Sequence, residues 1–243
     1  MSGHSKWATT KHKKGVIDAK RSKVFTKAAK VITVAARDGK SGDPTMNPSL
    51  RIAIDNAKGV SMPKDNIDRA IKRGLGGLDG GAQLEEIAYE AYGPNGVAIL
   101  IECLTDNRNR ALGELKTILN KAGGSIASTG SVSYLFSRVG QIIIDEAANT
   151  KKGDELEMAI IDSGASDFSK EENLYIVTCP FAQLISVKKS LEEANVVIDI
   201  AESVYIPSLY VDVPEDKKPL AEKILEDLDD LDDVNSVYSN VNI

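Results

Sequence analysis

The sequence contains few cysteine, histidine and aromatic residues, and it has no long apolar run. Its 243 residues include two cysteines, two histidines and one tryptophan. Two cysteines exclude a disulfide-rich scaffold, and both Cys103 and Cys179 lie in apolar, strand-like runs, which indicates reduced core thiols. No apolar run approaches the ~20 residues that cross a bilayer, and the first residues lack the apolar stretch of a signal peptide. We therefore expect a cytoplasmic protein of two or three domains with no membrane partner.

Residues that carry catalysis or bind metals are also scarce. Both histidines, His4 and His12, lie among lysines and away from any element that forms a pocket. General acid–base chemistry needs a base within reach of its partner, and a metal site needs further ligands. The glycine-rich stretch 74–81 lacks the lysine and the strand-to-helix setting of a phosphate loop. We therefore predict a protein that is not an enzyme and carries no cofactor and no metal.

Charge is segregated along the chain. Residues 1–80 contain 17 Lys and Arg against 7 Asp and Glu, a net charge of +10, whereas the remainder has 13 basic and 29 acidic residues, a net charge of −16. A basic segment joined to an acidic body predicts that the first part binds a polyanion. The most acidic stretch, Glu226–Asp233, carries leucines at helical spacing, so its carboxylates are expected on a solvated helix face.

The first group of basic residues lies at the start of the chain. Ser2–Gly15 contains no acidic residue and holds the only tryptophan. Its candidate nucleic-acid-binding residues are Lys6, Trp7, Lys11, His12, Lys13 and Lys14. Lysines neutralise phosphates and release counterions, and the indole ring offers a face on which a base stacks. The alternative is a solubilising tail, but its few apolar residues favour a segment that orders on a partner.

Two further groups of basic residues lie on predicted helices. The helix expected from about 18 to 38 carries Lys20, Arg21, Lys23, Lys27 and Lys30. The helix expected from about 63 to 73 ends in Arg69, Lys72 and Arg73. These basic residues could simply be exposed to solvent without binding anything. Together with the basic residues of Ser2–Gly15, however, they predict one surface that binds nucleic acid. Arg108 and Arg110, in TDNRNR, fit a secondary contact to nucleic acid or ion pairs with the acidic body equally well.

Periodicity and turn residues predict the order of the elements. Helices are expected at 18–38, at 48–59 and at 63–73, and the glycines of 74–81 mark a domain boundary. A hairpin around GPNG and a helix from about 108 to 122 follow. Two separate strands are then expected, VSYLF at 132–136 and GQIIID at 140–145.

The second half of the chain predicts an inserted domain. From 140 to 206 the order is strand, helix, strand, strand, helix, strand, which is typical of a ferredoxin-like domain. The remaining strand, helix and strand cannot close a domain alone, so we expect them to join the first hairpin. The predicted fold is α+β: a basic tail and three-helix bundle in residues 1–80, a discontinuous α+β domain in 81–136 plus 207–243, and an inserted α+β domain in 137–206.

Three long runs resemble a known family. They are MSGHSKWATTKHKKG, ARDGKSGDPTMNPSLRIAIDNAKGVSMPKDNIDRAIKRG and YEAYGPNGVAILIECLTDNRNR, and together they resemble the YebC/PmpR family over essentially the whole chain. The resemblance implies an N-terminal helical bundle and two α+β domains. It also implies a role either as a DNA-binding transcriptional regulator or as a translation factor that helps the ribosome through proline-containing stretches. The mitochondrial relatives in this family are translational activators.

Three functions follow from the residues and the resemblance. The first is a DNA-binding transcriptional regulator, although the three short helices show no helix-turn-helix pattern of base-reading residues, which favours contact with the phosphate backbone. The second is a ribosome-associated translation factor that binds rRNA or tRNA, because RNA is recognised by shape, phosphates and stacking. The third, a protein-interaction adaptor, leaves the basic bundle without a role. We predict the first, with the second as the alternative, and favour a monomer.

Overall fold

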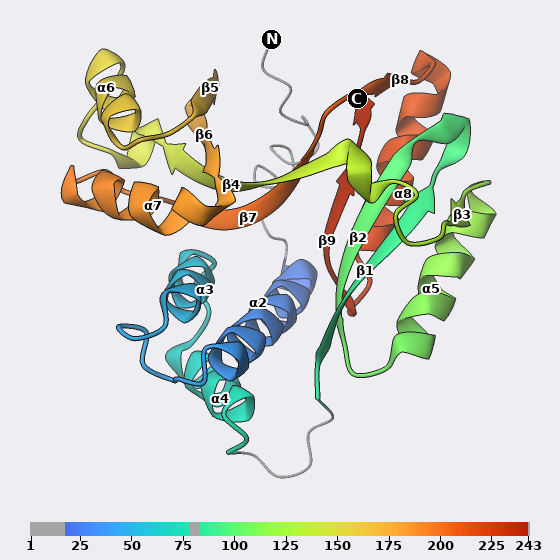
Figure 1. Cartoon of the computed structure of the whole chain (residues 1–243), viewed down its shortest axis with the longest axis horizontal. Coiled ribbons are helices and arrows are strands. Elements are labelled where there is room, and N and C mark those ends of the chain that lie inside the picture. Colours follow the sequence, from blue (N-terminus) through green and yellow to red (C-terminus); the bar gives the residue numbers. More distant parts are fainter. Residues whose placement is uncertain (1–17, 78–82, 243) are drawn as a thin grey trace.

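The computed structural model describes residues 18–77 and 83–242, and within them the side chains from residue 22 onward. Figure 1 shows a blue bundle of helices and two units in which helices cover a sheet, one on each side of the view. The fold class expected from the sequence, α+β with an N-terminal helical bundle followed by sheets, is therefore confirmed. No helix in the described ranges is both long enough and apolar enough for a membrane crossing.

The helical bundle consists of α2 (Asp18–Asp38), α3 (Pro48–Gly59) and α4 (Lys64–Gly74). Its core joins one apolar face of each helix, including Ile32, Leu50 and Ile67. The start of α3 is fixed locally, because the Asn47 side chain accepts a hydrogen bond from the Leu50 amide and a proline occupies the first turn. At the end of α4, a β-carbon on Gly74 would lie 2.3 Å from the Thr33 carbonyl oxygen, so glycine permits close packing on α2.

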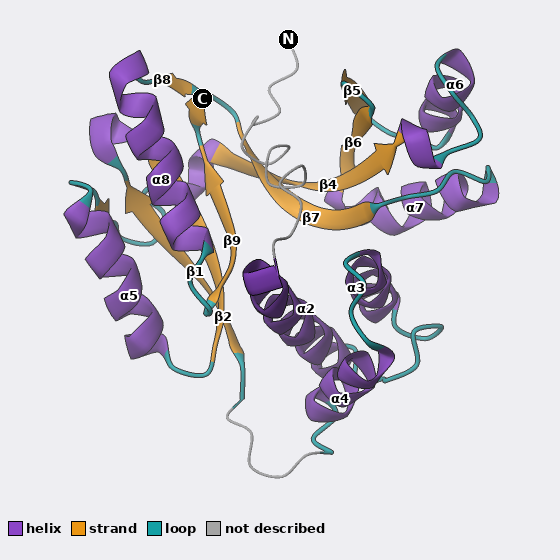
Figure 2. Cartoon of the chain, turned by 180° about the vertical axis from the view of Figure 1, so that it is seen from behind, coloured by secondary structure: helices purple, strands orange, loops and turns teal. Residues whose placement is uncertain are grey.

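The first sheet unit combines segments from both ends of the chain. Its elements are β1 (Glu85–Tyr92), β2 (Ala98–Thr105), α5 (Arg108–Lys121), β3 (Ser125–Ile126), α8 (Lys218–Asp229) and β9 (Val234–Ser239). The strands are antiparallel in the order β3-β1-β2-β9. Leucines of α5 and α8, among them Leu115 and Leu228, pack on Ile99 and Ile101 of β2. Both helices therefore cover the same face of the sheet, as Figure 2 shows from behind.

The second sheet unit has the chain order expected for a ferredoxin-like domain. Its elements are β4 (Phe136–Asp145), α6 (Asp154–Asp162), β5 (Asp167–Glu171), β6 (Leu174–Pro180), α7 (Leu184–Glu193) and β7 (Ile200–Pro207). The strands are antiparallel in the order β5-β6-β4-β7. A short parallel pair, β8 (Val211–Asp212) and β10 (Val241–Asn242), follows in the C-terminal segment.

One strand expected from the sequence is wrong. The segment VSYLF forms a turn of 3-10 helix at Ser133–Leu135, and β4 begins at Phe136 and continues without a break to Asp145. The turn is fixed by the buried carboxylate of Glu90, which accepts hydrogen bonds from the amides of Gly130, Val132 and Ser133. Burial would raise the pKa of Glu90, but these amides outweigh it and the pKa is lowered.

The two sheet units are joined by the long strands β4 and β7. Figure 1 shows both strands running from the second unit to the first. A small apolar cluster around Ala98, Leu100 and Phe136 lies at the junction, and Tyr205 of β7 meets Tyr238 of β9 edge to face with ring centroids 5.4 Å apart. The junction is therefore packed by apolar side chains as well as by the continuous backbone.

Candidate nucleic-acid interface

The second half of α4, including its last turn, is an exposed basic surface. Arg69, Lys72 and Arg73, here called the α4 basic turn, are exposed, while Ile67 and Ala70 on the opposite face are buried in the bundle. Within residues 18–77 and 83–242, none of these three cations forms an ion pair. Cations at a helix C-terminus are favoured by the helix dipole, which explains their position. Asp65 and Asp68 lie four positions before Arg69 and Lys72, so they offset part of this charge without pairing with it.

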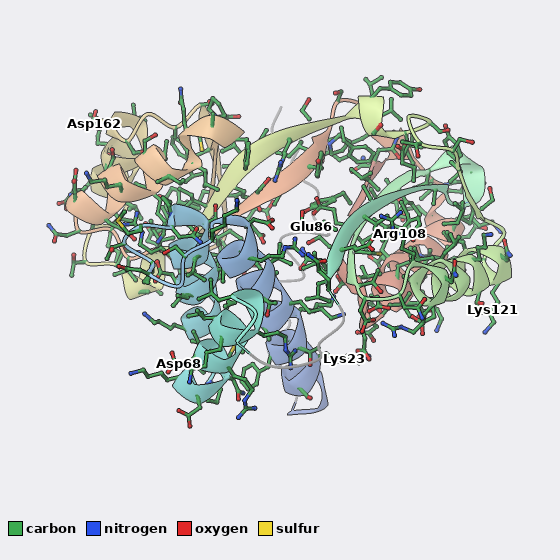
Figure 3. All side chains as sticks on the ribbon, turned by 60° about the horizontal axis from the view of Figure 1, so that its bottom comes forward. Lys23, Asp68, Glu86, Arg108, Lys121 and Asp162 are labelled. Atoms are coloured by element: carbon green, nitrogen blue, oxygen red, sulfur yellow. The ribbon has the colours of Figure 1, made fainter. Side chains whose placement is uncertain are left out.

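The lysines of α2 lie in a different environment. Lys23, Lys27 and Lys30, here called the α2 lysine stripe, contact Asp229–Asp233, here called the acidic turn, where α8 ends. Figure 3 shows Lys23 on the side of α2 turned toward the first sheet unit and Asp68 of α4 on the far side of the bundle. Lys20 and Arg21 also belong to α2, but their side chains lie outside the described residues, as do Lys6, Trp7, Lys11, His12, Lys13 and Lys14.

Each lysine of the α2 lysine stripe has an oxygen partner in or next to the acidic turn. The Lys23 ammonium donates to the Asp230 carbonyl at 2.9 Å, and the Lys27 ammonium to the Asp229 carbonyl at 2.5 Å. The Lys30 ammonium donates to the carbonyls of Asp232 at 2.7 Å and Leu104 at 2.9 Å, and it lies 3.0 Å from the Asp233 carboxylate. The stripe expected to bind nucleic acid therefore already holds an anionic segment of the same chain.

The acidic turn corrects part of the expectation that Glu226–Asp233 forms a solvated face, because Asp227, Asp230 and Asp232 are exposed but other carboxylates of the segment are not. The Asp233 side chain is only 3% exposed, and the Asp229 side chain is 20% exposed. Asp233 lies between Lys30 and Arg110, with its carboxylate 2.7 Å from Arg110 Nη2. Burial would raise the pKa of Asp233, but hydrogen bonds from Lys30 and Arg110 outweigh burial and lower it. Helical spacing identified the apolar side of α8 correctly but could not show what meets the other side.

Arg108 and Arg110 both form ion pairs with the acidic body. Arg108 pairs with Glu85 at the start of β1, and Arg110 pairs with Asp233 and, at 2.8 Å, with Asp106. The start of α5 is capped by the Asn107 side chain, which accepts from the Arg110 amide. The sequence left open whether these arginines contact nucleic acid or form ion pairs with the acidic body, and the structure shows the ion pairs. A secondary contact of these arginines with nucleic acid stays a prediction.

A second contact of the bundle was not expected from the sequence. Lys188 of α7 is 3% exposed and pairs with Asp55 of α3 at 2.5 Å and with Glu192 at 3.0 Å. Nearby, the Asn56 side chain exchanges two hydrogen bonds with the backbone of Ala201 in β7. The sequence does contain a signal for the burial of Lys188, because this residue lies one position after Val187 and three before Leu191, on the apolar side of α7.

The cysteines are core residues, as the sequence indicated. Both Cys103 and Cys179 are free and buried. Burial raises the pKa of Cys103 to about 12 and raises that of Cys179 as well, so both thiols are protonated at neutral pH and are poor nucleophiles. In the part of the chain that the structure describes, no three His, Cys, Asp or Glu side chains gather as a metal site would require.

These features define a class of α+β proteins in which a basic helical bundle contacts two antiparallel sheet units rich in acidic residues. Two family models match the chain: the TACO1/YebC protein N-terminal domain at residues 5–77, and the TACO1/YebC second and third domain at residues 84–241. The chain therefore belongs to the TACO1/YebC family, which confirms the resemblance found in the sequence.

Similar proteins agree with this assignment. A relative from Salinispora arenicola is 50% identical over 243 residues, which cover 100% of this chain and 96% of the relative. A relative from Rhodococcus opacus is 49% identical with the same coverage. Both are named "Probable transcriptional regulatory protein". A crystal structure of a conserved hypothetical protein from Aquifex aeolicus is 40% identical and superposes with a TM-score of 0.89, covering 98% of this chain and 96% of that one.

Proposed function

We propose that this chain is a non-enzymatic, cytoplasmic protein that binds nucleic acid through its N-terminal part and regulates gene expression as a DNA-binding transcriptional regulator. The observation that carries the proposal is the α4 basic turn, whose three cations are exposed and form no ion pair within the described residues. Phosphate groups are the natural partners of such a cluster. The names of the relatives, "Probable transcriptional regulatory protein", support the regulatory role.

The geometry of α4 also favours a second candidate, a ribosome-associated translation factor. A DNA-reading helix presents base-contacting residues near its N-terminus, whereas three of the four cations of α4 lie in its second half and only Lys64 is at its start. Such a surface contacts phosphates without reading bases, and it suits structured RNA as well as duplex DNA. The two candidates therefore share one surface and differ in the nucleic acid that it meets.

Crosslinking in cells separates the two candidates. Ultraviolet crosslinking of the tagged protein, followed by sequencing of the attached nucleic acid, should recover chromosomal DNA for the regulator. Recovery of ribosomal RNA or tRNA instead would support the translation factor. A matched control is the chain with Arg69, Lys72 and Arg73 changed to glutamine, which should lose most of the signal. Equal recovery with this variant would contradict the role given to the α4 basic turn.

Binding should depend strongly on salt. If roughly six phosphates are contacted, the logarithm of the affinity should fall against the logarithm of the salt concentration with a slope of about −5 on duplex DNA, and less steeply on single strands. Fluorescence anisotropy titrations at several salt concentrations measure this slope. An affinity that stays constant from low to physiological salt would show that phosphate contacts do not drive binding.

Trp7 should contribute by stacking on a base. Replacing it with alanine is expected to weaken binding by about 1–3 kcal/mol, the usual contribution of one aromatic platform, and to leave the melting temperature nearly unchanged. Trp7→Phe, which keeps a flat ring, is the matched control and should retain most of the affinity. A marked fall of the melting temperature in Trp7→Ala would instead show that the ring is part of the folded core.

A further inference from the structure

The acidic turn offers the α2 lysine stripe the same kind of partner that a nucleic-acid backbone would offer. The last carbonyl groups of a helix have no partner inside the helix, and they form the negative end of its dipole. At the end of α8, the Lys27 ammonium meets both the carbonyl of Asp229 at 2.5 Å and its carboxylate at 3.2 Å. One ammonium thus meets a carbonyl oxygen and a carboxylate oxygen together, and charged acceptors of this kind are also what a phosphate group offers.

This contact is formed by polar groups, whereas the other contact of the bundle combines polar groups with a packed apolar side chain. No apolar side chain of the described part of the bundle belongs to the core of the first sheet unit. On the opposite side, Ile52 of α3 packs against the core of the second sheet unit, and the neighbouring Lys188 is buried. Separating the α2 lysine stripe from the acidic turn therefore exposes little apolar surface, and other anions can substitute for the oxygens that the lysines lose.

We propose that the acidic turn is an autoinhibitory mimic of a nucleic-acid backbone: it occupies the α2 lysine stripe in the free protein, and a bound polynucleotide displaces it. This inference rests on the proposed function and adds a regulation to it. In the free protein the α4 basic turn is open to a first contact, and the lysines of α2 become available only when the acidic turn leaves. The apparent affinity for the polynucleotide is then the intrinsic affinity of the open stripe multiplied by the fraction of time that the stripe is open.

The closed state can be measured without any nucleic acid. A carbodiimide joins an ammonium to a carboxylate with no spacer, and Lys27 lies 3.2 Å from the Asp229 carboxylate while Lys23 lies 4.0 Å from that of Asp230. Mass spectrometry of the digested free protein should therefore find a peptide of α2 linked to the peptide of the acidic turn. Saturating amounts of a short DNA duplex or a structured RNA should strongly reduce this link. A link that forms equally in the complex would overturn the proposal.

Charge reversal tests the effect on affinity. In the double variant Asp229→Lys/Asp230→Lys the acidic turn repels the α2 lysine stripe, and in the matched control Glu222→Lys/Asp227→Lys the same charge is added on exposed positions of α8. If the stripe is open about a tenth of the time in the free protein, the first variant should bind a DNA duplex about tenfold more tightly than the control. Equal affinities of the two variants would overturn the proposal.

A folding check with milder variants and a comparison of outcomes separate failure of the proposed competition from failure of the proposed function. Circular dichroism checks folding, and if the reversed variant does not fold, Asp229→Asn/Asp230→Asn is compared with Glu222→Gln/Asp227→Asn, with an expected gain of about threefold from the smaller change in charge. If the link forms in the free protein but neither DNA nor RNA binds to any variant, the proposed function is wrong and the competition falls with it. If all variants bind equally, the function stands and only the competition is wrong.

Discussion

Replacing Arg69, Lys72 and Arg73 together with glutamine should weaken binding to a DNA duplex about a hundredfold near physiological salt. Each phosphate contact contributes a slope of about −0.9 to the dependence of log affinity on log salt, which corresponds to about fivefold in affinity at roughly 0.15 M relative to 1 M salt. Three contacts multiply to about a hundredfold, and the salt slope should become flatter by about 2.7. Anisotropy titrations at several salt concentrations give both quantities from one data set.

A matched control separates a local surface from total charge. Lys116 and Lys121 of α5 and Lys223 of α8 are exposed, and Figure 3 labels Lys121 at the end of α5. Their joint replacement with glutamine removes the same charge from the first sheet unit and should change the affinity only slightly. Thermal unfolding should be unaffected in both triple variants, because no side chain involved is buried. Equal losses of affinity in the two would show that net charge, and not the α4 basic turn, determines binding.

Local signals predicted the helices of the bundle and their ends. Pro48 and Asn47 at the start of α3, and the apolar spacing that follows, act within one or two turns, so a sequence shows them directly. The sequence pattern divides β4 in two because the polar residues Ser137 and Arg138 interrupt the apolar pattern. Residues 137–139 pair with Val204–Ile206 of β7, more than 60 positions later, and such pairing is not visible in a local pattern.

The candidate site shows the same division between local and distant causes. Spacing of three and four residues correctly placed Lys23, Lys27 and Lys30 on one side of α2. What that side faces depends on residues about 200 positions away. A local pattern shows no partner for the carboxylates of the acidic turn, so it predicts that they face solvent. Opposite charges at the two ends of the chain were visible in the sequence, but only the fold shows that part of each neutralises the other.

Asp233→Asn should lower the midpoint of thermal unfolding by roughly 5–10 °C at neutral pH. The Asp233 carboxylate is 3% exposed and lies between the cations of Lys30 and Arg110. An amide of the same shape leaves the two cations close together without a counter-charge, at a cost of about 2–3 kcal/mol. For a chain of this size each kcal/mol corresponds to about 2–4 °C. Asp227→Asn, on the exposed side of α8, should change the midpoint very little.

Acid should abolish this difference, and the direction follows from the pKa of Asp233. Burial would raise that pKa, but the hydrogen bonds from Lys30 and Arg110 outweigh burial and hold it below its usual range. A carboxylate with a lowered pKa stabilises the folded state fully above the pKa of the unfolded chain, about 4, and loses this effect as the pH falls through the folded-state pKa. The midpoints of the wild-type protein and Asp233→Asn should therefore converge in acid. A difference that persists unchanged there would show that shape, and not charge, gives Asp233 its role between the bundle and the first sheet unit.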